Sequence, residues 1–488
     1  MDSCDDGSPF DKLPPELICT ICDHLDLEAL KALSLTCHRL EQICANQCAH
    51  RFFLCIPGNR LAYYNYQLGT IAEKVEEAAI LLKSTKRRYR RVHLDVQYEP
   101  EADSIEHMQA ILDKQLLQQL AVLKLDLPAL SGNLAVHLSN VVAKMDCLLE
   151  LDICYRHQLT NVSLPLSSDL NLINRSLRKL SLDCVLSARI DCPNMQSLAV
   201  KGPFDIEAIV GKQYALHGVR EPYWKLKHIK ELVITKHLHS HPFPDSSTLA
   251  ASYRVQFYRQ LQHLKKLYYN VNGASDWILQ TICESCVQLE LLYFLVLEVE
   301  DQNSLRFLSN LTNLRELNIL SARNVISFAG VRLPNLKTLL LDFVEIYWPP
   351  VEGFDSIEWL KIKAFPWQEK QICDLFAGPL NRLRFLWIEL PVDLELSWYR
   401  NIFAALTKLP ALKTLVLHNM PSLNHLNVMK PLLQLTKLTV HLSYGSDGTT
   451  DPVEVPKLVP NVERIKIYEG MELEKVRWNK NVASVPKI

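Results

Sequence analysis

A six-residue pattern of apolar positions, apolar-x-x-apolar-x-apolar, recurs fourteen times along the chain. Its second half alternates apolar and polar positions, which is the period of a β-strand with one buried face. The units begin at Leu120, Leu148, Leu177, Met195, Ile229, Leu264, Leu289, Leu314, Leu336, Ile357, Leu383, Leu412, Leu435 and Val462. Each unit therefore predicts one short strand.

Turns of one kind precede many of these strands. A proline stands two residues before the first apolar position at residues 193, 334, 410 and 460, and asparagine follows it in three of the four cases. Proline disfavours helix in the residue before it, and asparagine favours turns. Helix-like stretches such as 276–283 and 401–409 lie between the strands. The repeating unit is therefore strand, turn and helix.

The units are about 26 residues apart on average between Leu120 and Val462, within the roughly 20–29 residues of leucine-rich repeats. A unit of this size cannot bury its apolar face alone, so neighbours must stack. We predict an α/β repeat solenoid with a parallel sheet on the concave side, helices on the convex side and the curvature of a horseshoe. A weaker copy of the pattern, Leu94 and Val96, is expected to open the array.

The array is irregular. The position where many such repeats carry asparagine or cysteine is Val344 in one unit and Phe365 in another. Two long connections, through Tyr223-Trp224 and through 242–244, are expected to leave the rim as loops. The Gly, Ser, Asp and Thr cluster at 445–450 predicts a further loop.

The N-terminal segment has helical spacing instead. Pro14-Pro15-Glu16 is a helix-start signal, and apolar residues follow at helical spacing as far as Leu25. Asp26 is placed to cap a second helix, and a third begins near Thr36. About 40 residues is near the lower limit for a self-sufficient core, so we expect these helices to complete their burial against another protein or as a cap on the solenoid.

This segment resembles an F-box from about Phe10 to Ile56. The resemblance is carried by Leu13-Pro14-Pro15-Glu16-Leu17-Ile18, by His24-Leu25-Asp26 and by Leu33-Ser34-Leu35-Thr36-Cys37-His38-Arg39. The sequence departs from the family at Leu40, where a tryptophan usually follows the Cys-x-Arg turn. The contact made by that tryptophan is therefore expected to be weaker or differently packed.

The resemblance implies binding to a Skp-family adaptor, which links an F-box to a cullin and its RING subunit. An F-box joined to leucine-rich repeats resembles the substrate receptors of SCF ubiquitin ligases, which hold a protein for ubiquitination and proteasomal degradation. A scaffold that binds the adaptor without serving a ligase is the alternative. The residues that match the family's adaptor-binding positions are Leu13, Pro14, Leu17, Ile21, Leu30, Leu33 and Leu35.

The residues that alternate with the buried positions face outward on the predicted concave sheet. Several are large and apolar, which is typical of binding hot spots. We predict a substrate site at Tyr268, Leu291, Tyr293, Leu295, Leu340, Trp359, Phe385 and Trp387. The charged residues at outward positions differ between the two ends of the array. The early repeats carry acidic residues, which are Asp95, Asp126, Glu150, Asp152 and Asp183, and the late repeats carry basic residues, which are Lys361, Lys363, Lys437, Arg464 and Lys466. Coverage of the rings by the C-terminal tail or a long loop is the alternative.

Composition narrows the function classes. With 53 basic and 54 acidic side chains the net charge is −1, which gives no bulk attraction to nucleic acid or to an anionic membrane. The N-terminus is acidic and polar, unlike a secretory signal. We expect an intracellular protein, in the cytoplasm, the nucleus or both. The 14 cysteines are then expected to be free thiols.

The sequence gives only weak indications of a metal site, a targeting signal or a catalytic site. Cys19-x-x-Cys22 and Cys283-x-x-Cys286 lie on predicted helices far apart, and alternating histidines at 237, 239 and 241 have no carboxylate or cysteine nearby in sequence. The basic run 86–91 suits a nuclear-import signal, a contact with an acidic partner or a solvated helix end. No phosphate-binding glycine loop or nucleophile motif occurs. We expect no metal, no cofactor and no catalysis by this chain.

The expected organisation has five parts. Residues 1–9 form an acidic tail, 10–56 the F-box and 57–90 a helical linker with a basic end. Residues 91–470 form the repeat solenoid, with about 14–15 irregular repeats, and 471–488 a C-terminal tail.

Overall fold

The computed structural model describes most of the 488 residues. The described ranges are 13–47, 53–56, 70–84, 89–97, 99–112, 114–128, 132–155, 170–183, 189–202, 224, 226–236, 248–271, 273–301, 303–347, 354–378, 380–391, 395–428, 432–443, 462–469 and 473–479. The chain divides into two compact units: Met1–Ile229 with His239–Tyr253, and Lys230–Leu238 with Arg254–Ile488.

The first unit begins with three helices and continues as alternating helices and parallel strands. Its helices are α1 (Pro15–His24), α2 (Leu27–Ser34), α3 (His38–Gln47), α4 (Ile71–Ser84), α5 (Glu101–Ile111), α6 (Lys114–Gln119) and α7 (Gly132–Ala143). Its strands are β1 (Phe53–Ile56), β2 (Arg91–Asp95), β3 (Val122–Leu127), β4 (Glu150–Tyr155), β5 (Asn171–Ile173), β6 (Lys179–Asp183), β7 (Arg189–Asp191) and β8 (Ser197–Gly202).

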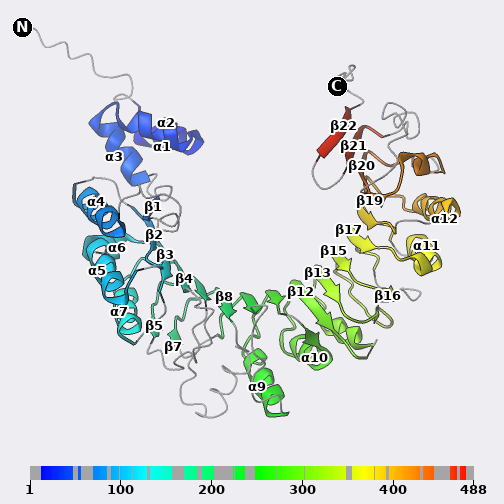
Figure 1. The fold of residues 1–488 in the computed structure, drawn as a ribbon, viewed down its shortest axis with the longest axis horizontal. Coiled ribbons are helices and arrows are strands. Elements are labelled where there is room, and N and C mark those ends of the chain that lie inside the picture. The colour runs from blue at the N-terminus through cyan, green and yellow to red at the C-terminus, as the bar shows by residue number, and fades with distance from the viewer. Residues whose placement is uncertain are drawn as a thin grey trace, which may run out of the picture. The chain divides into compact units, whose positions relative to one another are not determined.

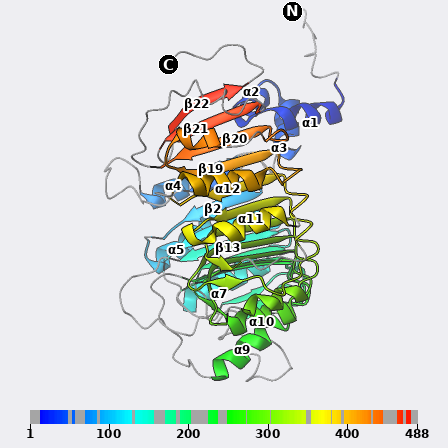
Figure 2. The ribbon, with the colours of Figure 1, turned by 90° about the vertical axis from the view of Figure 1, so that its right-hand side faces the viewer.

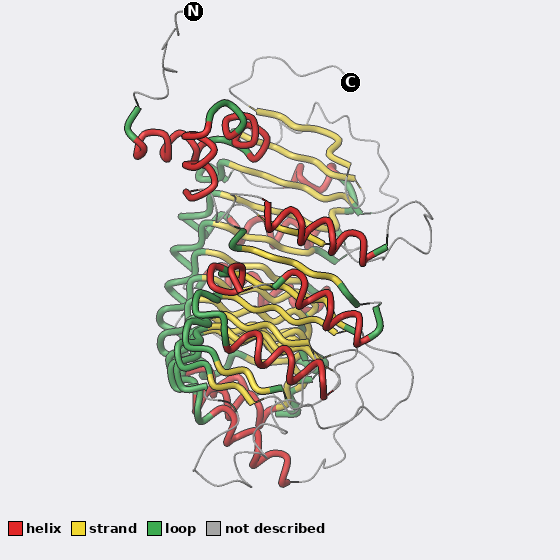
Figure 3. Tube along the Cα trace, turned by 90° about the vertical axis from the view of Figure 1, so that its left-hand side faces the viewer, coloured by secondary structure: helices red, strands yellow, loops and turns green. Residues whose placement is uncertain are grey.

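Six of these strands pair in parallel, in the order β1, β2, β3, β4, β6 and β8, and β5 and β7 form a small separate pair. The helices α4, α5 and α7 lie on one side of the strands (Figure 1). Turns, drawn in green in Figure 3, stack along one edge of the strands.

The second unit repeats this plan with more strands. Its strands are β9 (Glu231–Lys236), β10 (Lys266–Asn270), β11 (Ala274–Ser275), β12 (Leu291–Glu298), β13 (Glu316–Ala322), β14 (Ile326–Ser327), β15 (Thr338–Phe343), β16 (Ile346–Tyr347), β17 (Trp359–Lys363), β18 (Phe385–Glu389), β19 (Thr414–Met420), β20 (Lys437–Leu442), β21 (Arg464–Glu469) and β22 (Leu473–Asn479). Its helices are α10 (Asp276–Ser285), η4 (Ser304–Asn310), η5 (Pro366–Gln368), α11 (Glu369–Ala377), α12 (Leu396–Leu406) and η6 (Leu423–Val428). The helix α9 (Thr248–Tyr258) crosses the division between the two units.

Ten of these strands pair in parallel, in the order β9, β10, β12, β13, β15, β17, β18, β19, β20 and β21. β22 closes the row by pairing antiparallel with β21. The helices α10, α11 and α12 lie on one side of the strands (Figures 1 and 2). We call the opposite side of this sheet the open face.

Each predicted strand is present, and its apolar positions form the core. All three apolar residues of each of the fourteen six-residue patterns are buried, and the most exposed of them, Ile234, is only 4% exposed. The weaker copy is confirmed as well, because Leu94 lies in β2 and both Leu94 and Val96 are buried. The large parallel sheet with helices on one side is an α/β arrangement, consistent with a solenoid.

One backbone carbonyl at the start of each strand fixes the next strand. Two consecutive amides of the following strand donate to it, as Lys337 N and Thr338 N do to Arg315 O at 2.8 and 2.9 Å. The same arrangement recurs at Ala121, Leu149 and Arg178 in the first unit, and at Lys265, Glu290, Lys337, Glu358, Arg384, Lys413 and Thr436 in the second. A strand therefore cannot slip by one residue without losing both bonds.

Side chains in the turns add a second connection between one strand-turn-helix unit and the next along the chain. The Nδ2 of Asn335 donates to Thr312 O at 2.9 Å, and the Nδ2 of Asn194 donates to Arg175 O at 2.7 Å. These asparagines belong to the Pro-Asn turns of the sequence, so the turn residue also joins its unit to the preceding one. Asn335→Ala would leave the Thr312 carbonyl without that donor.

The three N-terminal helices share a small core of their own. Ile18, Cys22, Leu30, Leu40 and Cys44 are buried together. α1 begins at Pro15 as predicted, and the predicted cap of α2 is confirmed, because Asp26 Oδ1 accepts from Ala29 N at 2.7 Å. Ser34, Thr36 and Thr20 hydroxyls donate to carbonyls three or four residues earlier.

Three segments expected from the sequence have the following structure. Residues 53–56, at the end of the expected F-box, form β1, in which Leu54 and Ile56 alternate with exposed neighbours and pair with β2. The linker 57–90, expected to be helical, contains α4, whose residues Ile71 and Val75 are buried. The segment 471–488, expected to be a tail, contains β22, which pairs with β21.

One expected loop is also wrong at a described residue. Trp224 is 1% exposed and forms a parallel bridge with Ile190, so this residue is buried within the first unit. A tryptophan buries more apolar surface than any other side chain, which draws the connection inward at this point. The segments 242–244 and 445–450 lie outside the described residues.

The alternation of faces gives a matched pair of stability tests. Leu339 is fully buried, whereas the next residue, Leu340, is half-buried on the open face. Leu339→Ala should cost about 2–5 kcal/mol because it leaves a cavity, and Leu340→Ala should cost less than about 1.5 kcal/mol. Hydrogen exchange of the β13, β15 and β17 amides measures both; equal loss of protection in the two variants would contradict the assignment of faces.

Candidate functional site

The N-terminal helices carry exposed apolar residues on their surface. Leu17 is 53% exposed, Ile21 is 40% exposed and Leu35 is 75% exposed. Leu17 and Ile21 are four residues apart on α1, so they lie on one face of the helix. Pro14 is exposed beside them. Four of the seven predicted adaptor-binding residues are therefore accessible to a partner.

The other three residues differ. Leu30 is 1% exposed and belongs to the helical core, so it cannot contact an adaptor directly, and this part of the prediction is wrong. Leu13 and Leu33 are half-buried against the same core. Leu40, where the family usually has tryptophan, is fully buried in that core. Apolar spacing alone did not separate the two faces of these short helices.

The eight predicted substrate-binding residues all lie half-buried on the open face. Two rows of aligned residues cross the strands there. The first row contains Tyr268, Tyr293, Asn318, Leu340, Lys361, Trp387, Val416, Thr439 and Lys466. The second row contains Leu291, Glu316, Thr338, Trp359, Phe385, Thr414, Lys437 and Arg464.

The rows divide the predicted aromatic centre into two groups. Tyr268 and Tyr293 lie on neighbouring strands with ring centroids 6.2 Å apart. Trp359 and Phe385 stack at 4.5 Å and 8°. Between the two groups lie β13 and β15, where the first row carries Asn318 and Leu340. The structure therefore does not bring all eight residues into one cluster.

The second group extends further than the sequence predicted. Trp387 and His441 are parallel within 3° at 6.4 Å, and His441 stacks on Tyr468 at 4.7 Å and 12°. His418 lies 5.1 Å from His441 and 6.1 Å from Trp387. We call Trp387, His418, His441 and Tyr468 the ring wall.

A bulge in β19 lies beside this wall. The pairing of β19 with β20 shifts between Leu417 and Met420, and Asn419 takes the left-handed region with φ 61°. Asparagine tolerates that region better than most residues. The Asn419 amide also donates to Glu389 Oε1 at 3.3 Å. His418 follows Thr414 and Val416 at alternate positions and pairs in register with Glu389, so alternation does place it on the open face. The predicted site omitted it because that site was restricted to large apolar side chains.

The basic residues predicted on the outward face of the late repeats differ in whether a carboxylate lies beside them. Lys361 Nζ lies 2.9 Å from Asp342 and 4.5 Å from the Trp387 ring centroid. Lys363 Nζ lies 2.9 Å from Glu389. Both are therefore neutralised by carboxylates of the same sheet. Lys437, Arg464 and Lys466 have no carboxylate within ion-pair distance among the described residues, so they form the cationic part of the face.

These cations border a pocket of about 280 Å³ at the end of the open face. Its lining residues are Phe385, Trp387, Thr414, Val416, Lys437, Leu438, Thr439, His441, Arg464, Lys466 and Tyr468. One side of the pocket is aromatic and the other is cationic. An anionic group with an apolar neighbour fits that combination.

Burial sets the charge of the two histidines. It lowers the pKa of His418, while the charge of Glu389 has a smaller raising effect and Lys361 lowers this pKa further. It also lowers the pKa of His441, and His418 lowers it further. The Nδ1 of His418 is buried without a hydrogen-bond partner in the described part of the chain. Both rings are therefore neutral near pH 7, and the positive charge of this region comes from lysine and arginine.

A further aromatic patch was missed by the sequence reasoning. Phe343 is 57% exposed, Tyr347 is 48% exposed and Trp367 is 64% exposed. Trp367 stacks on Phe365 at 5.3 Å and donates to Glu345 Oε1 at 2.9 Å. Phe343 ends β15, Tyr347 lies in the short strand β16 and Trp367 lies in η5. All three stand beyond the six positions of the repeating pattern, so that pattern does not include them.

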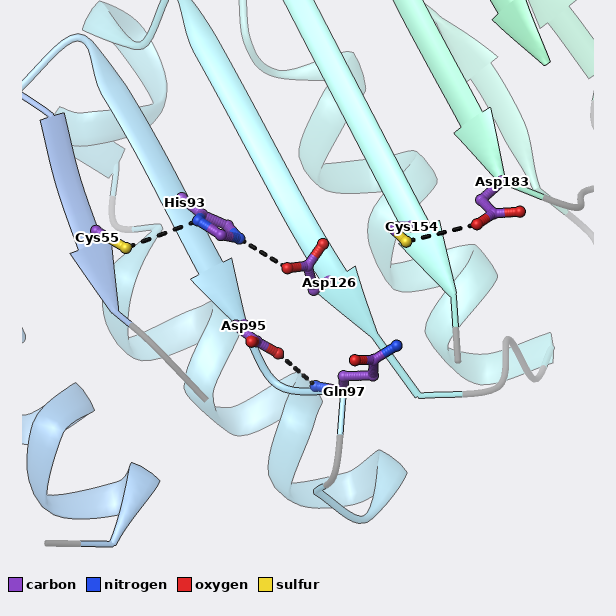
Figure 4. A network of polar contacts seen from close by, with 7 residues as sticks. All are labelled: Cys55, His93, Asp95, Gln97, Asp126, Cys154 and Asp183. Atoms are coloured by element: carbon purple, nitrogen blue, oxygen red, sulfur yellow. Dashed lines mark hydrogen bonds and ion pairs between the residues drawn. The ribbon is translucent and has the colours of Figure 1, made fainter. Parts of the chain in front are cut away.

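The early acidic residues contradict the prediction of an exposed acidic flank. Asp95, Asp126 and Asp183 are 3%, 2% and 7% exposed. A buried carboxylate requires polar partners, and each has them. His93 Nε2 lies 2.8 Å from Asp126, Gln97 N donates to Asp95, and the Cys154 thiol donates to Asp183 (Figure 4). Of the five predicted residues, Glu150 and Asp152 remain accessible.

One part of this network has the order of a catalytic triad. Cys55 Sγ lies 3.7 Å from His93 Nδ1, and His93 Nε2 lies 2.8 Å from Asp126, across three adjacent strands (Figure 4). A nucleophilic cysteine needs a lowered pKa. Burial raises the pKa of Cys55, and the charges of Asp95 and Asp126 raise it further. The arrangement therefore connects β1, β2 and β3 and is poorly suited to nucleophilic catalysis.

The two Cys-x-x-Cys pairs lie at helices as predicted. Cys22 is buried, with its sulfur 3.8 Å from that of Cys44. Burial raises the pKa of Cys286 to about 12 and also raises that of Cys283. No group of three or more metal-ligating side chains occurs among the described residues, and 237–241 lies outside them. In the described part of the chain, no helix is both long and apolar enough to cross a membrane.

Comparison with known proteins adds one finding. The family model described as F-box-like matches residues 10–55. The chain therefore carries an F-box-like domain at its N-terminal helices, and F-box domains typically bind Skp-family adaptors. A search of curated proteins finds no match.

The lowered pKa values of His418 and His441 predict that the stability of the folded chain depends on pH. Because the folded-state pKa values of His418 and His441 lie below 6.5, the unfolded chain binds protons first as the pH falls below about 6.5, and stability decreases there. The double variant His418→Phe with His441→Phe should weaken this decrease. Thermal unfolding between about pH 7.5 and pH 5.5 measures it, with His263→Phe as the exposed control; an unchanged pH dependence in the double variant would count against the argument.

Proposed function

We propose that this chain is the substrate-recognition subunit of an SCF-type E3 ubiquitin ligase. The proposal depends on one combination: an F-box-like domain with exposed Leu17, Ile21 and Leu35, followed by a sheet whose open face bears aromatic rings and cations that have no carboxylate partner among the described residues. The first surface suits a Skp-family adaptor, through which a cullin and its RING subunit are reached. The second suits a protein substrate.

The strand-turn-helix units are, in this proposal, leucine-rich repeats. The support is the buried apolar triplet in each unit, the parallel pairing and the side-chain bonds between consecutive turns. The curvature of a horseshoe, expected for such repeats, is part of the proposal. The helices occupy one side of the sheet, which leaves the open face for a partner.

The chain itself performs no chemistry in this role. It holds the substrate near ubiquitin-charged machinery and raises its effective concentration there. The assembly would act in the cytoplasm, the nucleus or both, and a captured substrate would be ubiquitinated and degraded by the proteasome. A scaffold that binds the adaptor without promoting degradation is the competing function.

Adaptor binding is tested on the exposed face of α1. Leu17→Asp and Ile21→Asp place a charge where an apolar contact is proposed, so each should reduce adaptor co-purification at least about tenfold, because a buried unpaired charge is costly. Ile80→Asp, at a residue of α4 that is 60% exposed, is the control. Full retention of the adaptor by both α1 variants would refute this surface.

Substrate capture is tested on the second aromatic group. Replacing Trp359 and Trp387 together with alanine should abolish capture of the chain's partners and leave adaptor binding intact, because exposed tryptophans dominate binding energy. Tyr268→Ala with Tyr293→Ala tests the first group separately. Unchanged capture in the tryptophan variant would remove the second group from the site.

The ligase and scaffold functions differ in the fate of the partner. A captured partner should have a shorter half-life with the full chain than with residues 1–47 deleted, because only the full chain reaches the ligase. The deletion ends before β1, whose pairing with β2 belongs to the sheet. A half-life unaffected by the deletion would favour the scaffold.

A further inference from the structure

Lys437, Arg464 and Lys466 form a group of cations at one end of the open face. Several basic side chains elsewhere in the sheet meet a carboxylate: Lys265 with Glu290, Lys337 with Glu358, and Lys361 with Asp342. Lys437, Arg464 and Lys466 do not meet one among the described residues. Lys266 in β10 has no such partner there either, but only at β20 and β21 do three of these cations lie on adjacent strands in the described part of the sheet.

The arrangement of these cations is unfavourable on its own. Lys437 and Arg464 are direct partners across β20 and β21, and Thr439 pairs with Lys466 in the same register. Like charges directly opposite each other on a sheet destabilise it. Lys466 also lies 3.4 Å from the hydroxyl of Tyr468, which supplies no negative charge. An anion bound here would relieve the repulsion.

The pocket supplies the other contacts that such an anion requires. Thr414 and Thr439 line it, and neither of their hydroxyls makes a hydrogen bond within the described part of the chain. The ring wall forms the opposite side, with Trp387 half-buried and parallel to His441. A ligand with a carboxylate on one side and an apolar group on the other would satisfy both sides of the pocket.

The spacing of the cations favours an extended peptide over a single compact anion. Arg464 and Lys466 are two residues apart on one strand, which separates their Cα atoms by about 6.6 Å. An extended peptide repeats its side chains on one face at the same interval. A run of alternate glutamates or aspartates therefore matches the two positions, whereas one phosphate would be served better by donors that converge on a point.

We propose that this pocket binds an extended acidic segment of the protein partner. Carboxylates at alternate positions of the segment lie against Arg464 and Lys466, with Lys437 beside them. A neighbouring apolar or aromatic residue of the segment packs on the ring wall. The inference rests on the proposed role of the open face in holding a substrate, and it specifies the chemistry by which a substrate is chosen.

The test uses the full chain co-expressed with its adaptor and a short fluorescent peptide. The peptide carries glutamates at alternate positions around one phenylalanine, and its partner peptide carries glutamine at the same positions. We expect the glutamate peptide to bind at least about tenfold more tightly. Its affinity should fall as the salt concentration rises, because partly exposed charges are screened.

Variants locate the contact. Arg464→Glu and Lys466→Glu should each weaken binding of the glutamate peptide at least about tenfold, and Trp387→Ala should weaken it as well. Lys408→Glu makes the same change of charge at an exposed residue beside α12, and it should leave the affinity within about twofold. Retained adaptor binding and an unchanged circular dichroism spectrum confirm that each variant is folded.

Several results would overturn the inference. Equal binding of the glutamate and glutamine peptides, or no binding of either, would remove the acidic segment. An equal loss in Lys408→Glu would show attraction by net charge alone. Binding only when phosphoserine replaces the glutamates would assign the pocket to a phosphorylated partner instead. Because the peptide assay does not depend on degradation, its failure and that of the ligase proposal are distinguishable.

Discussion

The registration of each strand on the one before it is the constraint on which the rest of the molecule depends. A single carbonyl accepts two consecutive amides of the next strand, and a buried apolar triplet follows at once. A slip by one residue would expose the triplet and bury the alternating polar residues. Local bonds therefore determine which residues of different strands align, and the rows on the open face follow from them.

Most of this constraint can be predicted from the sequence, because it is local. The spacing of apolar residues predicts the buried triplet of each of the fourteen patterns, and the Pro-Asn turns mark where several strands start. β1 lies at the end of the segment that resembles an F-box, and its four residues are too few to show the repeating pattern, although Leu54 and Ile56 alternate correctly. β22 was missed for a different reason: it pairs antiparallel and belongs to no repeat.

The candidate sites were harder to predict because exposure depends on contacts between distant residues. Leu30 and Leu17 are both leucines at helical spacing, yet one is in the core of the three helices and the other is on the surface. Asp126 occupies an outward position, yet His93 and its other surroundings bury it. His418 occupies a regular alternate position of β19, but its contact with His441 and Trp387 depends on neighbouring strands that the local pattern does not specify.

Charge compensation distinguishes β17, in the middle of the open face of the second unit, from β20 and β21 near its end. At Lys361 and Lys363 the sheet supplies its own carboxylates, so these side chains are held beside the rings and are not available to an anion. At β20 and β21 the compensation stops while the rings continue through His441 and Tyr468. The histidines do not compensate either, because burial keeps them neutral near pH 7. In the proposed recognition of an acidic segment, this end of the face offers fixed positive charge beside the ring wall, and a partner is selected by the negative charge that it supplies.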